Sequence, residues 1–231
     1  MFERPHHRRI AFILEALDAE MLAASGCLFG GGTAMTLRFG EYRESADIDF
    51  LVSRVEGYRH LRQRLTGLDG TRAITRPGHI LTQTREVRAD QYGLRTSLQV
   101  EGIDIKFEIV LEGRIELEAP GPDDRQCGVA TLTPLDMATS KLLANSDRWR
   151  DDAVMSRDLI DLAMMAPPKA LVKQAMVKAQ GAYGDSVAAD LARAVEDLRA
   201  RPHRLDQCMK AMAMTTVSKA VLWARIKALV R

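Results

Sequence analysis

Two patterns of apolar and polar positions divide this chain. Between residues 103 and 109 apolar side chains stand at every second position, and with the preceding residues this predicts a β-hairpin with strands 94–100 and 103–111 joined at Glu101–Gly102. After residue 133 strand patterns are absent, and alanine, leucine, methionine and lysine dominate. These residues are good helix formers, so the C-terminal part is predicted to be helical.

The residues ahead of the hairpin predict short elements of both kinds. Their apolar spacing indicates helices at 8–24, 33–39 and 55–66, strands at 27–30 and 46–52, a basic strand region at 71–90, and one further strand at 115–118. Gly26 and Gly40 stand where two of these helices are expected to end.

A break at residues 119–124, which read APGPDD, marks the end of the first part. Thr133 and Pro134, followed by Asp136, form a typical helix start. Four or five helices should follow, with breaks near 145–149, 167–168, 181–185 and 201–202. The predicted fold is therefore α+β, with a small mixed sheet and flanking helices in a core domain at 1–125, and a helical bundle at 126–231.

Composition narrows the classes of protein. The chain is 46% hydrophobic and 28% charged, as ordinary globular proteins are. No apolar run approaches the roughly 18–20 residues that span a bilayer, and the N-terminal residues lack the apolar core of a signal peptide. Three distant cysteines without CxxC spacing argue against disulfides or zinc, and five scattered histidines show no zinc-ligand spacing. We expect a cytoplasmic protein without a membrane segment.

Charge is unevenly spread along the chain. The formal net charge is +2, yet residues 199–231 contain eight basic residues and one acidic residue, a local charge of +7. Such a field attracts nucleic acid. A solvated helix face has the same composition, so this observation alone does not separate the two interpretations.

The candidate chemistry lies in the string FGGGT at 29–33 and the string DIDF at 47–50. Side chains two apart on a strand share a face, so Asp47 and Asp49 point the same way. A glycine turn that opens a helix presents free backbone N–H groups at the positive helix end, which suits phosphate. Carboxylates beside such a turn indicate a divalent metal, the basis of phosphoryl or nucleotidyl transfer.

A third carboxylate, Glu108, lies on the polar face of the predicted strand 103–111, with Asp104 as an alternative on the same face. Two carboxylates about 4 Å apart repel by roughly 1 kcal/mol in water and about 4 kcal/mol at a protein surface. A cation would offset that repulsion, and Mg²⁺ or Mn²⁺ takes carboxylate and phosphate oxygens as ligands. Two such ions about 3.5–4 Å apart would activate a hydroxyl and neutralise leaving pyrophosphate.

Each of these features also has a simpler interpretation. A lone DxD is most often a solvated strand end. The glycine turn lacks both the GxGxxG of dinucleotide folds and the lysine of a P-loop, so it would then be a tight turn with Thr33 as a helix cap. The combination of the turn upstream and the acidic strand downstream favours the catalytic interpretation.

Together these strings resemble the AbiEii/AbiGii family of nucleotidyltransferases, the toxins of type IV toxin–antitoxin and phage-abortive systems in the DNA polymerase β-like superfamily. The resemblance in the N-terminal part rests on GGTA at 31–34, Leu37-Arg38, Gly40, Arg43, Ser45 and DIDF at 47–50. KFEI at 106–109 is similar to the third-carboxylate strand of that family, LDMATSKL at 135–142 to its lysine-bearing helix, and RDLIDL at 157–162 to its RDxxDL motif. About residues 26–165 take part.

The resemblance implies a role for each matching residue. Asp47, Asp49 and Glu108 would hold the metal, and Glu108 would also act as base toward the acceptor hydroxyl. Lys141 would contact phosphate, and Asp158 would lie near the nucleotide or orient Lys141. The implied nucleotide-binding residues are Gly31, Gly32, Thr33, Arg43, Ser45, Lys141 and Asp161.

The helical spacing by itself leaves two interpretations of the last motif open. Arg157, Asp158 and Asp161 lie three and four positions apart, so they can face one site. They can equally form an internal salt bridge or a solvated helix face.

The implied reaction is attack of an acceptor hydroxyl on the α-phosphate of a bound NTP, in a cleft between the two parts. Family analogy and the basic residues at 71–95 and 199–231 favour an RNA acceptor such as a tRNA 3′ end. The family also implies a cognate antitoxin protein. The alternatives are adenylylation of a small molecule or a protein side chain, and a nucleotide-binding interaction protein without catalysis.

Overall fold

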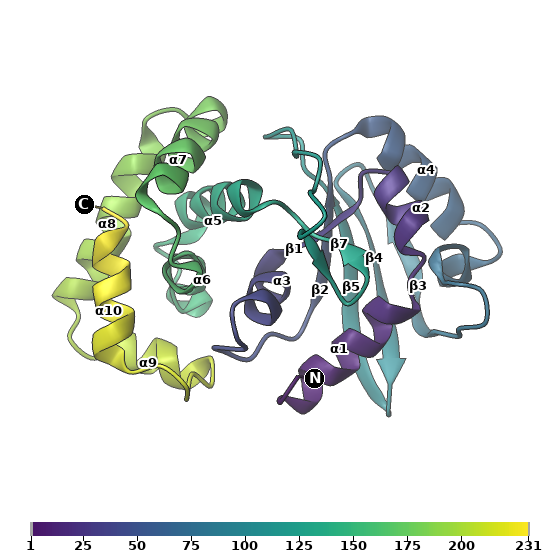
Figure 1. The fold of residues 1–231 in the computed structure, drawn as a ribbon, viewed down its shortest axis with the longest axis horizontal. Helices are drawn as coiled ribbons and strands as arrows, with labels where there is room; N and C mark the ends of the chain where they lie inside the picture. The colour runs from purple at the N-terminus through teal and green to yellow at the C-terminus, as the bar shows by residue number, and fades with distance from the viewer. Residues whose placement is uncertain (1, 231) are drawn as a thin grey trace. The chain divides into compact units, whose positions relative to one another are not determined.

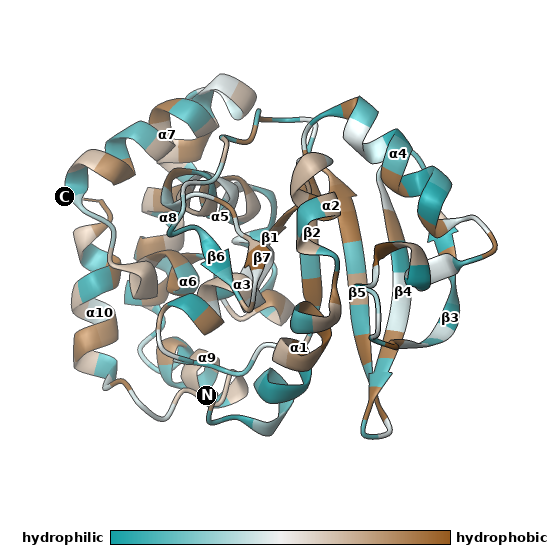
Figure 2. Ribbon diagram, turned by 45° about the vertical axis from the view of Figure 1, so that its right-hand side comes forward, coloured by the Kyte–Doolittle hydropathy of each residue, from teal (hydrophilic) through white to brown (hydrophobic). Residues whose placement is uncertain are grey.

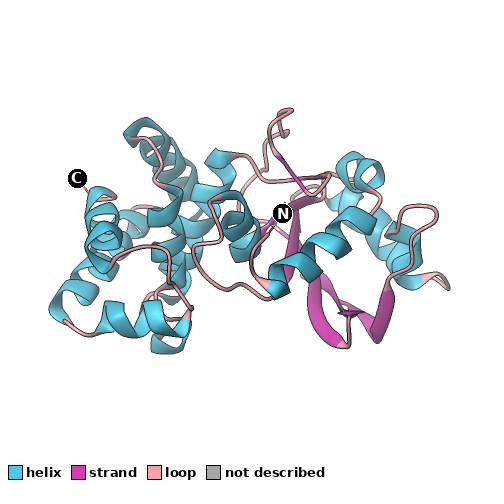
Figure 3. Ribbon diagram, turned by 60° about the horizontal axis from the view of Figure 1, so that its bottom comes forward, coloured by secondary structure: helices cyan, strands magenta, loops and turns pink. Residues whose placement is uncertain are grey.

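The computed structural model describes residues 2–230 and divides into two compact units. The first unit comprises the chain up to Arg38 together with Ser45–Thr133, and the second comprises Phe39–Glu44 together with the chain from Pro134 onward. Every strand of the described residues belongs to the first unit, and the second is built from helices (Figures 1 and 3). The predicted α+β class is confirmed.

The first unit is organised around a five-stranded mixed sheet of order β1-β2-β5-β4-β3 (Figure 1). The strands are β1 (Leu28–Gly30), β2 (Ile48–Val52), β3 (Thr82–Ala89), β4 (Gly93–Val100) and β5 (Ile103–Leu111). Strands β2 and β5 run parallel, and the other neighbours are antiparallel. The predicted hairpin is therefore present as β4 and β5. The basic region expected to be a strand from residue 71 begins with a short 3-10 helix, η1 (Gly70–Ile74), instead.

The sheet has one apolar and one polar face, because apolar and polar residues alternate along most of β5 and at the start of β2 (Figure 2). On the apolar face the ring of Phe50 lies 5.5 Å from that of Phe29 and 5.6 Å from that of Phe107. Helix α4 (Val55–Leu65) packs on this side, where Gly57 closely approaches the side chain of Val52. The core therefore lies on one side of the sheet, and much of the other side is left to polar residues.

The single helix predicted at 8–24 is wrong. Two helices stand in its place, α1 (Pro5–Ala16) and α2 (Ala19–Ala24). The backbone N–H of Asp18 donates to the carbonyl of Ile74 at 2.9 Å, and its side chain accepts from the N–H of Met21 at 3.0 Å. A tertiary bond to η1 thus interrupts the helix, and Asp18 caps the second one.

The strand predicted at 115–118 is also wrong. In this segment the N–H of Leu117 donates to Oγ of Ser53 at 3.1 Å, so a side chain takes the place of a neighbouring strand. A two-stranded ribbon follows instead, β6 (Arg125–Gln126) and β7 (Val129–Ala130). Cys127 and Gly128 between them both have positive φ, as the favoured two-residue hairpin turn requires.

The second unit contains six α-helices among the described residues, one more than expected. They are α5 (Pro134–Arg148), α6 (Arg157–Met165), α7 (Lys169–Tyr183), α8 (Ser186–Ala200), α9 (Arg204–Ala211) and α10 (Lys219–Ala228). The break that was missed separates α9 from α10, where Ala213 has a positive φ and Ser218 caps α10 by accepting from the N–H of Val221. No helix within residues 2–230 combines the length and apolar character needed to cross a membrane.

Candidate active site

The glycine turn brings the start of helix α3 (Gly31–Arg38) against Asp49. Gly30 pairs with Asp49 in the β1–β2 register, and Gly31 follows with a φ of +68°. A Cβ at Gly31 would lie 2.5 Å from Oδ2 of Asp49. Only glycine permits both this backbone conformation and this approach. The free N–H groups at the start of α3 therefore lie beside a carboxylate of the DxD pair, an arrangement suited to a phosphate with a bound cation.

Gly31→Ala is expected to lower the free energy of unfolding by about 1–3 kcal/mol, because alanine is strained at this φ. The added methyl group must also displace the Asp49 carboxylate. Gly181→Ala in α7 is the matched control, since nothing lies within 4 Å of its Cβ position. There we expect stability to rise by up to about 1 kcal/mol. Denaturant unfolding of both variants measures the difference, and equal effects would show that Gly31 carries no such constraint.

The chain just before Asp47 is held by side chains from α3 and α1. Thr33 is buried, and its Oγ1 donates to the carbonyl oxygen of Asp47 at 2.5 Å. Its oxygen also lies 2.8 Å from Oγ of Ser45. Because Thr33 has a single hydroxyl proton, Ser45 donates in this second bond. Thr33 and Ser45 therefore position the DxD segment through their side chains, and their contact with a nucleotide stays a prediction.

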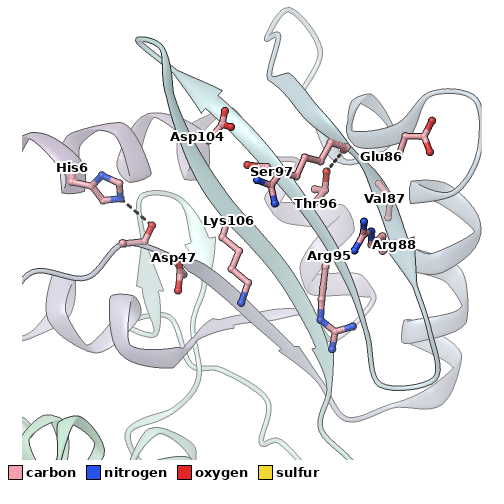
Figure 4. Close-up of a pocket in the computed structure, with 12 residues that line it drawn as sticks. His6, Asp47, Glu86, Val87, Arg88, Arg95, Thr96, Ser97, Asp104 and Lys106 are labelled. Carbon is pink, nitrogen blue, oxygen red and sulfur yellow. Dashed lines mark hydrogen bonds between the residues drawn. The ribbon is translucent and has the colours of Figure 1, made fainter. Parts of the chain in front are cut away.

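Two histidines on α1 complete this support, and neither was predicted as part of the site. The buried ring of His7 accepts from the backbone N–H of Ser45 through Nε2 at 3.2 Å. Nε2 of His6 lies 2.9 Å from the carbonyl oxygen of Ala46 (Figure 4). Some forty residues separate each pair in sequence, so no spacing motif could have revealed them.

The three predicted carboxylates lie on the polar face of the sheet. Asp47 is exposed and stands directly ahead of β2, and Asp49 pairs with Glu108 across the parallel β2–β5 ladder. Ile48 and Phe50 are buried on the other face, as expected. Within residues 2–230, however, no three acidic, histidine or cysteine side chains converge as a ready metal site.

Glu108 is engaged by two cations instead. Its Oε1 lies 2.9 Å from Nε of Arg95, and its Oε2 lies 2.6 Å from Nζ of Lys106. Its side chain is only 13% exposed, whereas those of Arg95 and Lys106 are 40% and 52% exposed. These two basic residues were not predicted as part of the site, although Lys106 stands in the KFEI string. The role of Glu108 as third metal ligand stays a prediction.

Lys106 places a fixed positive charge among the acids. Partial burial lowers the pKa of its ammonium group, but the hydrogen bond to Glu108 and the charges of Glu108, Asp47 and Asp49 outweigh this and raise the pKa above its usual value. Lys106 is therefore protonated at neutral pH, and it is close enough to all three carboxylates to offset part of their repulsion.

The carboxylates of Asp47 and Asp49 are suited to bind a divalent cation. Magnesium is commonly held by one or two protein carboxylates together with substrate phosphates. Asp47 and Asp49 share a face and lie at the N-terminus of α3, where phosphate is favoured. These two residues can therefore supply the protein ligands, with the remaining positions left for phosphate oxygens and water.

The other predicted residues form a buried ionic cluster within the second unit. Asp161 accepts two bonds from Arg43, at 2.6 Å from Nε and 2.9 Å from Nη2, and one from the hydroxyl of Tyr42 at 2.8 Å. Nζ of Lys141 lies 2.7 Å from Oδ2 of Asp161 and 3.0 Å from Oδ1 of Asp158. Asp158 and Asp161 thus form internal salt bridges with Lys141 and Arg43, residues from other parts of the unit.

A further arginine closes the cluster. Nε of Arg148 lies 2.7 Å from Oδ2 of Asp158, and Nη2 lies 3.0 Å from Oδ1. Arg148 was not predicted as part of the site, and it is the last residue of α5, which ends inside the break predicted at 145–149. Arg157 does not share the face of Asp158 and Asp161, since it is exposed and they are buried. A role of the cluster in nucleotide binding stays a prediction.

The charges of this cluster stabilise one another. Burial alone would raise the pKa of the Asp161 carboxyl, but Arg43 and Lys141 outweigh it and hold the pKa below its usual range. Burial would also raise the pKa of the Asp158 carboxyl, but Lys141 and Arg148 outweigh it and hold that pKa below its usual range. Both aspartates are therefore ionised at neutral pH.

Comparisons with known proteins identify the family to which this chain belongs. The family model "Nucleotidyl transferase AbiEii toxin, Type IV TA system" matches residues 13–228. The crystal structure of JHP933 from Helicobacter pylori is similar, with 16% identity, a TM-score of 0.55, and coverage of 100% of this chain and 94% of that one. A second H. pylori structure, provisionally assigned as a nucleotidyltransferase, gives 17% identity, a TM-score of 0.51, and coverage of 99% and 96%.

At these identities the two structures establish the fold alone, and no curated protein sequence matches the chain. The family match is broader evidence, because residues 13–228 include almost the whole sequence and both structural units. The chain therefore belongs to the AbiEii family of nucleotidyltransferase toxins of type IV toxin–antitoxin systems.

Proposed function

We propose that this nucleotidyltransferase uses Mg²⁺ or Mn²⁺ to transfer a nucleoside monophosphate from an NTP to a hydroxyl of RNA, with the 3′ end of a tRNA as the favoured acceptor. The observation that carries the proposal is the contact of the glycine turn with the DxD pair. The N-terminus of α3 and the Asp49 carboxylate lie side by side because Gly31 lacks a side chain. A triphosphate and its cation need both groups at one place.

Each residue of the site has a definite task in this reaction. The N–H groups at the start of α3 would bind phosphate oxygens, and Asp47 and Asp49 would hold the cation. The bound cation would supply charge neutralisation for the triphosphate and the departing pyrophosphate. Thr33 fixes the backbone of Asp47, so that its carboxylate keeps its place. Glu108 holds Lys106 and Arg95 on the same face, where Lys106 would stabilise negative charge that develops at phosphorus.

The choice of RNA rests on charge. Basic residues between 71 and 95 lie in the sheet unit that carries the acids, and residues 199–231 add a local charge of +7 in the helical unit. A polyanionic acceptor is attracted by such a field, and a small neutral acceptor is not. Membership in a type IV toxin family implies a cognate antitoxin. Growth arrest after expression, relieved by that antitoxin, is the corresponding expectation in cells.

Pyrophosphate release tests the proposal. Purified protein is incubated with each NTP, with or without total cellular RNA, in Mg²⁺ or in EDTA. We expect pyrophosphate only when NTP, RNA and Mg²⁺ are all present, and restoration when excess Mg²⁺ or Mn²⁺ follows EDTA. Pyrophosphate release without RNA, with nucleotide attached to protein or to a small molecule, would contradict RNA as the acceptor. Pyrophosphate release in EDTA would contradict the dependence on a divalent metal.

A further inference from the structure

A groove on the polar face of the sheet continues from the acids toward the edge strand β3. The cavity has a volume of about 710 Å³, within the range of ligand-binding pockets. Asp47 and Lys106 line one part of it, and Arg95 and Arg88 line another (Figure 4). Arg85 is a further lining residue. All of its lining residues belong to the first unit. None of the three arginines was assigned to a site on the sequence alone.

The strand register orders the charges across this face. Asp49 on β2 pairs with Glu108 on β5, Glu108 pairs with Arg95 on β4, and Arg95 pairs with Arg88 on β3. Neighbouring strands lie about 4.8 Å apart, so Arg88 stands about 10 Å from Glu108 along this row. The face is thus acidic at β2 and basic at β3.

An irregularity in β3 brings its two arginines together. Arg85 and Arg88 are three residues apart, and on a regular strand such residues point to opposite faces. The β3–β4 register shifts between them, so that Arg85 pairs with Ser97 and Arg88 pairs with Arg95, two residues on one face of β4. Both arginines line the groove. Bulges of this kind re-aim side chains and are common beside active sites.

These two arginines differ from Arg95 in their contacts. Arg95 is held by Asp90 at 2.8 Å and by Glu108 at 2.9 Å. Arg85 and Arg88 are exposed, and no ion pair or side-chain hydrogen bond of theirs occurs within residues 2–230. Asp104 and Glu86 also line the groove, but Asp104 already accepts bonds from Thr84 and Gln99.

We propose that this groove binds the acceptor RNA as a single strand, with its terminal hydroxyl at the acids and the phosphates behind it on Arg95, Arg88 and Arg85. The inference rests on the proposed function and names the surface that serves it. A nucleic-acid strand has a hydroxyl at its end and a phosphate for each nucleotide behind, which is the order of charges along the row. Exposed guanidinium groups bind phosphate in two-pronged geometry and stack on bases, so a strand of any sequence fits.

The test measures RNA binding without NTP or Mg²⁺, by fluorescence anisotropy of a short labelled single strand. In the double variant Arg85→Ala/Arg88→Ala we expect binding at low salt to weaken by about tenfold or more. The slope of log affinity against log salt should become shallower by about 1.4, because two phosphate contacts are lost. The affinity for NTP should not change.

Arg59→Ala/Arg62→Ala is the matched control. Both arginines are exposed on α4, which packs on the opposite face of the sheet, and the loss of charge is the same. Unchanged RNA affinity in the first variant, equal weakening in both, a loss of NTP affinity instead, or no RNA binding by the unmodified protein would each overturn the inference.

Failure of the groove and failure of the proposed function give different results. If the unmodified protein transfers nucleotide to RNA while Arg85→Ala/Arg88→Ala binds RNA normally, the groove is wrong and the function stands. If RNA binding depends on these arginines but no nucleotide is transferred to RNA, the surface stands and the proposed function is wrong.

Discussion

Asp49→Asn is expected to lower the rate of nucleotidyl transfer by at least about 10²–10³-fold, the usual loss when one preorganised charge is removed from a transition state. The change deletes one negative charge from the place where Gly31, the start of α3 and the DxD pair meet. The amide has nearly the shape of the carboxylate, so the fold should persist. Single-turnover transfer and far-ultraviolet circular dichroism measure the two effects separately.

The matched control for this variant is Asp69→Asn, which removes the same charge from an exposed position that makes no capping bond. Its transfer rate should equal that of the unmodified protein. Binding of Mn²⁺ in the presence of NTP, followed by electron paramagnetic resonance, adds a readout independent of turnover. Asp49→Asn should weaken that binding. Normal transfer by Asp49→Asn would remove this carboxylate from the mechanism.

Asp161→Asn is expected to lower the free energy of unfolding by about 3–5 kcal/mol, because it leaves buried cations without their counter-charge. Arg43 and Lys141 both contact the Asp161 carboxylate, whose side chain is 0% exposed. Glu196→Gln is the control, since Glu196 and its partner Arg199 are 65% and 73% exposed. There the loss should stay below about 1 kcal/mol. Denaturant unfolding measures the free energy of unfolding of both variants. A loss below about 1 kcal/mol in Asp161→Asn as well would contradict the stabilising role of this cluster.

The same cluster predicts how stability depends on pH. The pKa values of Asp158 and Asp161 lie below their usual range in the folded protein, whereas an unfolded aspartate has a pKa of about 3.9. In acid the unfolded chain therefore takes up protons first, so stability falls as the pH drops below about 5. Asp161→Asn should show a shallower fall in this range, because it has lost one depressed carboxyl. An unchanged slope would contradict the assignment.

The sheet unit could be predicted where local pattern and tertiary contact agree. The alternation along β5 predicted that strand and its polar face. The apolar residues Ile48 and Phe50 on either side of Asp49 likewise predicted β2 and its buried face. The spacing of apolar residues did not predict the elements correctly where a distant segment determines the local structure. The bond between Asp18 and Ile74 divides α1 from α2, and the Cys127–Gly128 turn forms a ribbon too short for any alternation to be seen.

The candidate site shows the same division. Gly31, Asp47 and Asp49 carry their chemistry in their spacing, so the sequence identified them together. Arg95 was missed because it meets Glu108 through the β4–β5 register, which the sequence does not display. Lys106 stands two residues from Glu108 on the same strand, so its place on that face could be predicted, but its ion pair with Glu108 could not. Lys141 was read as a phosphate ligand from its family resemblance. In the structure its ammonium group lies between two buried aspartates.

The most direct test of the central claim is transfer of label from each α-³²P NTP to RNA in Mg²⁺, resolved on a denaturing gel, with Asp49→Asn run in parallel. We expect label in a discrete RNA band with at least one NTP, and none with the variant. RNA whose 3′-terminal diol has been oxidised by periodate should accept no label. Equal labelling by Asp49→Asn, or label found in protein or small molecules and absent from RNA, would contradict the account.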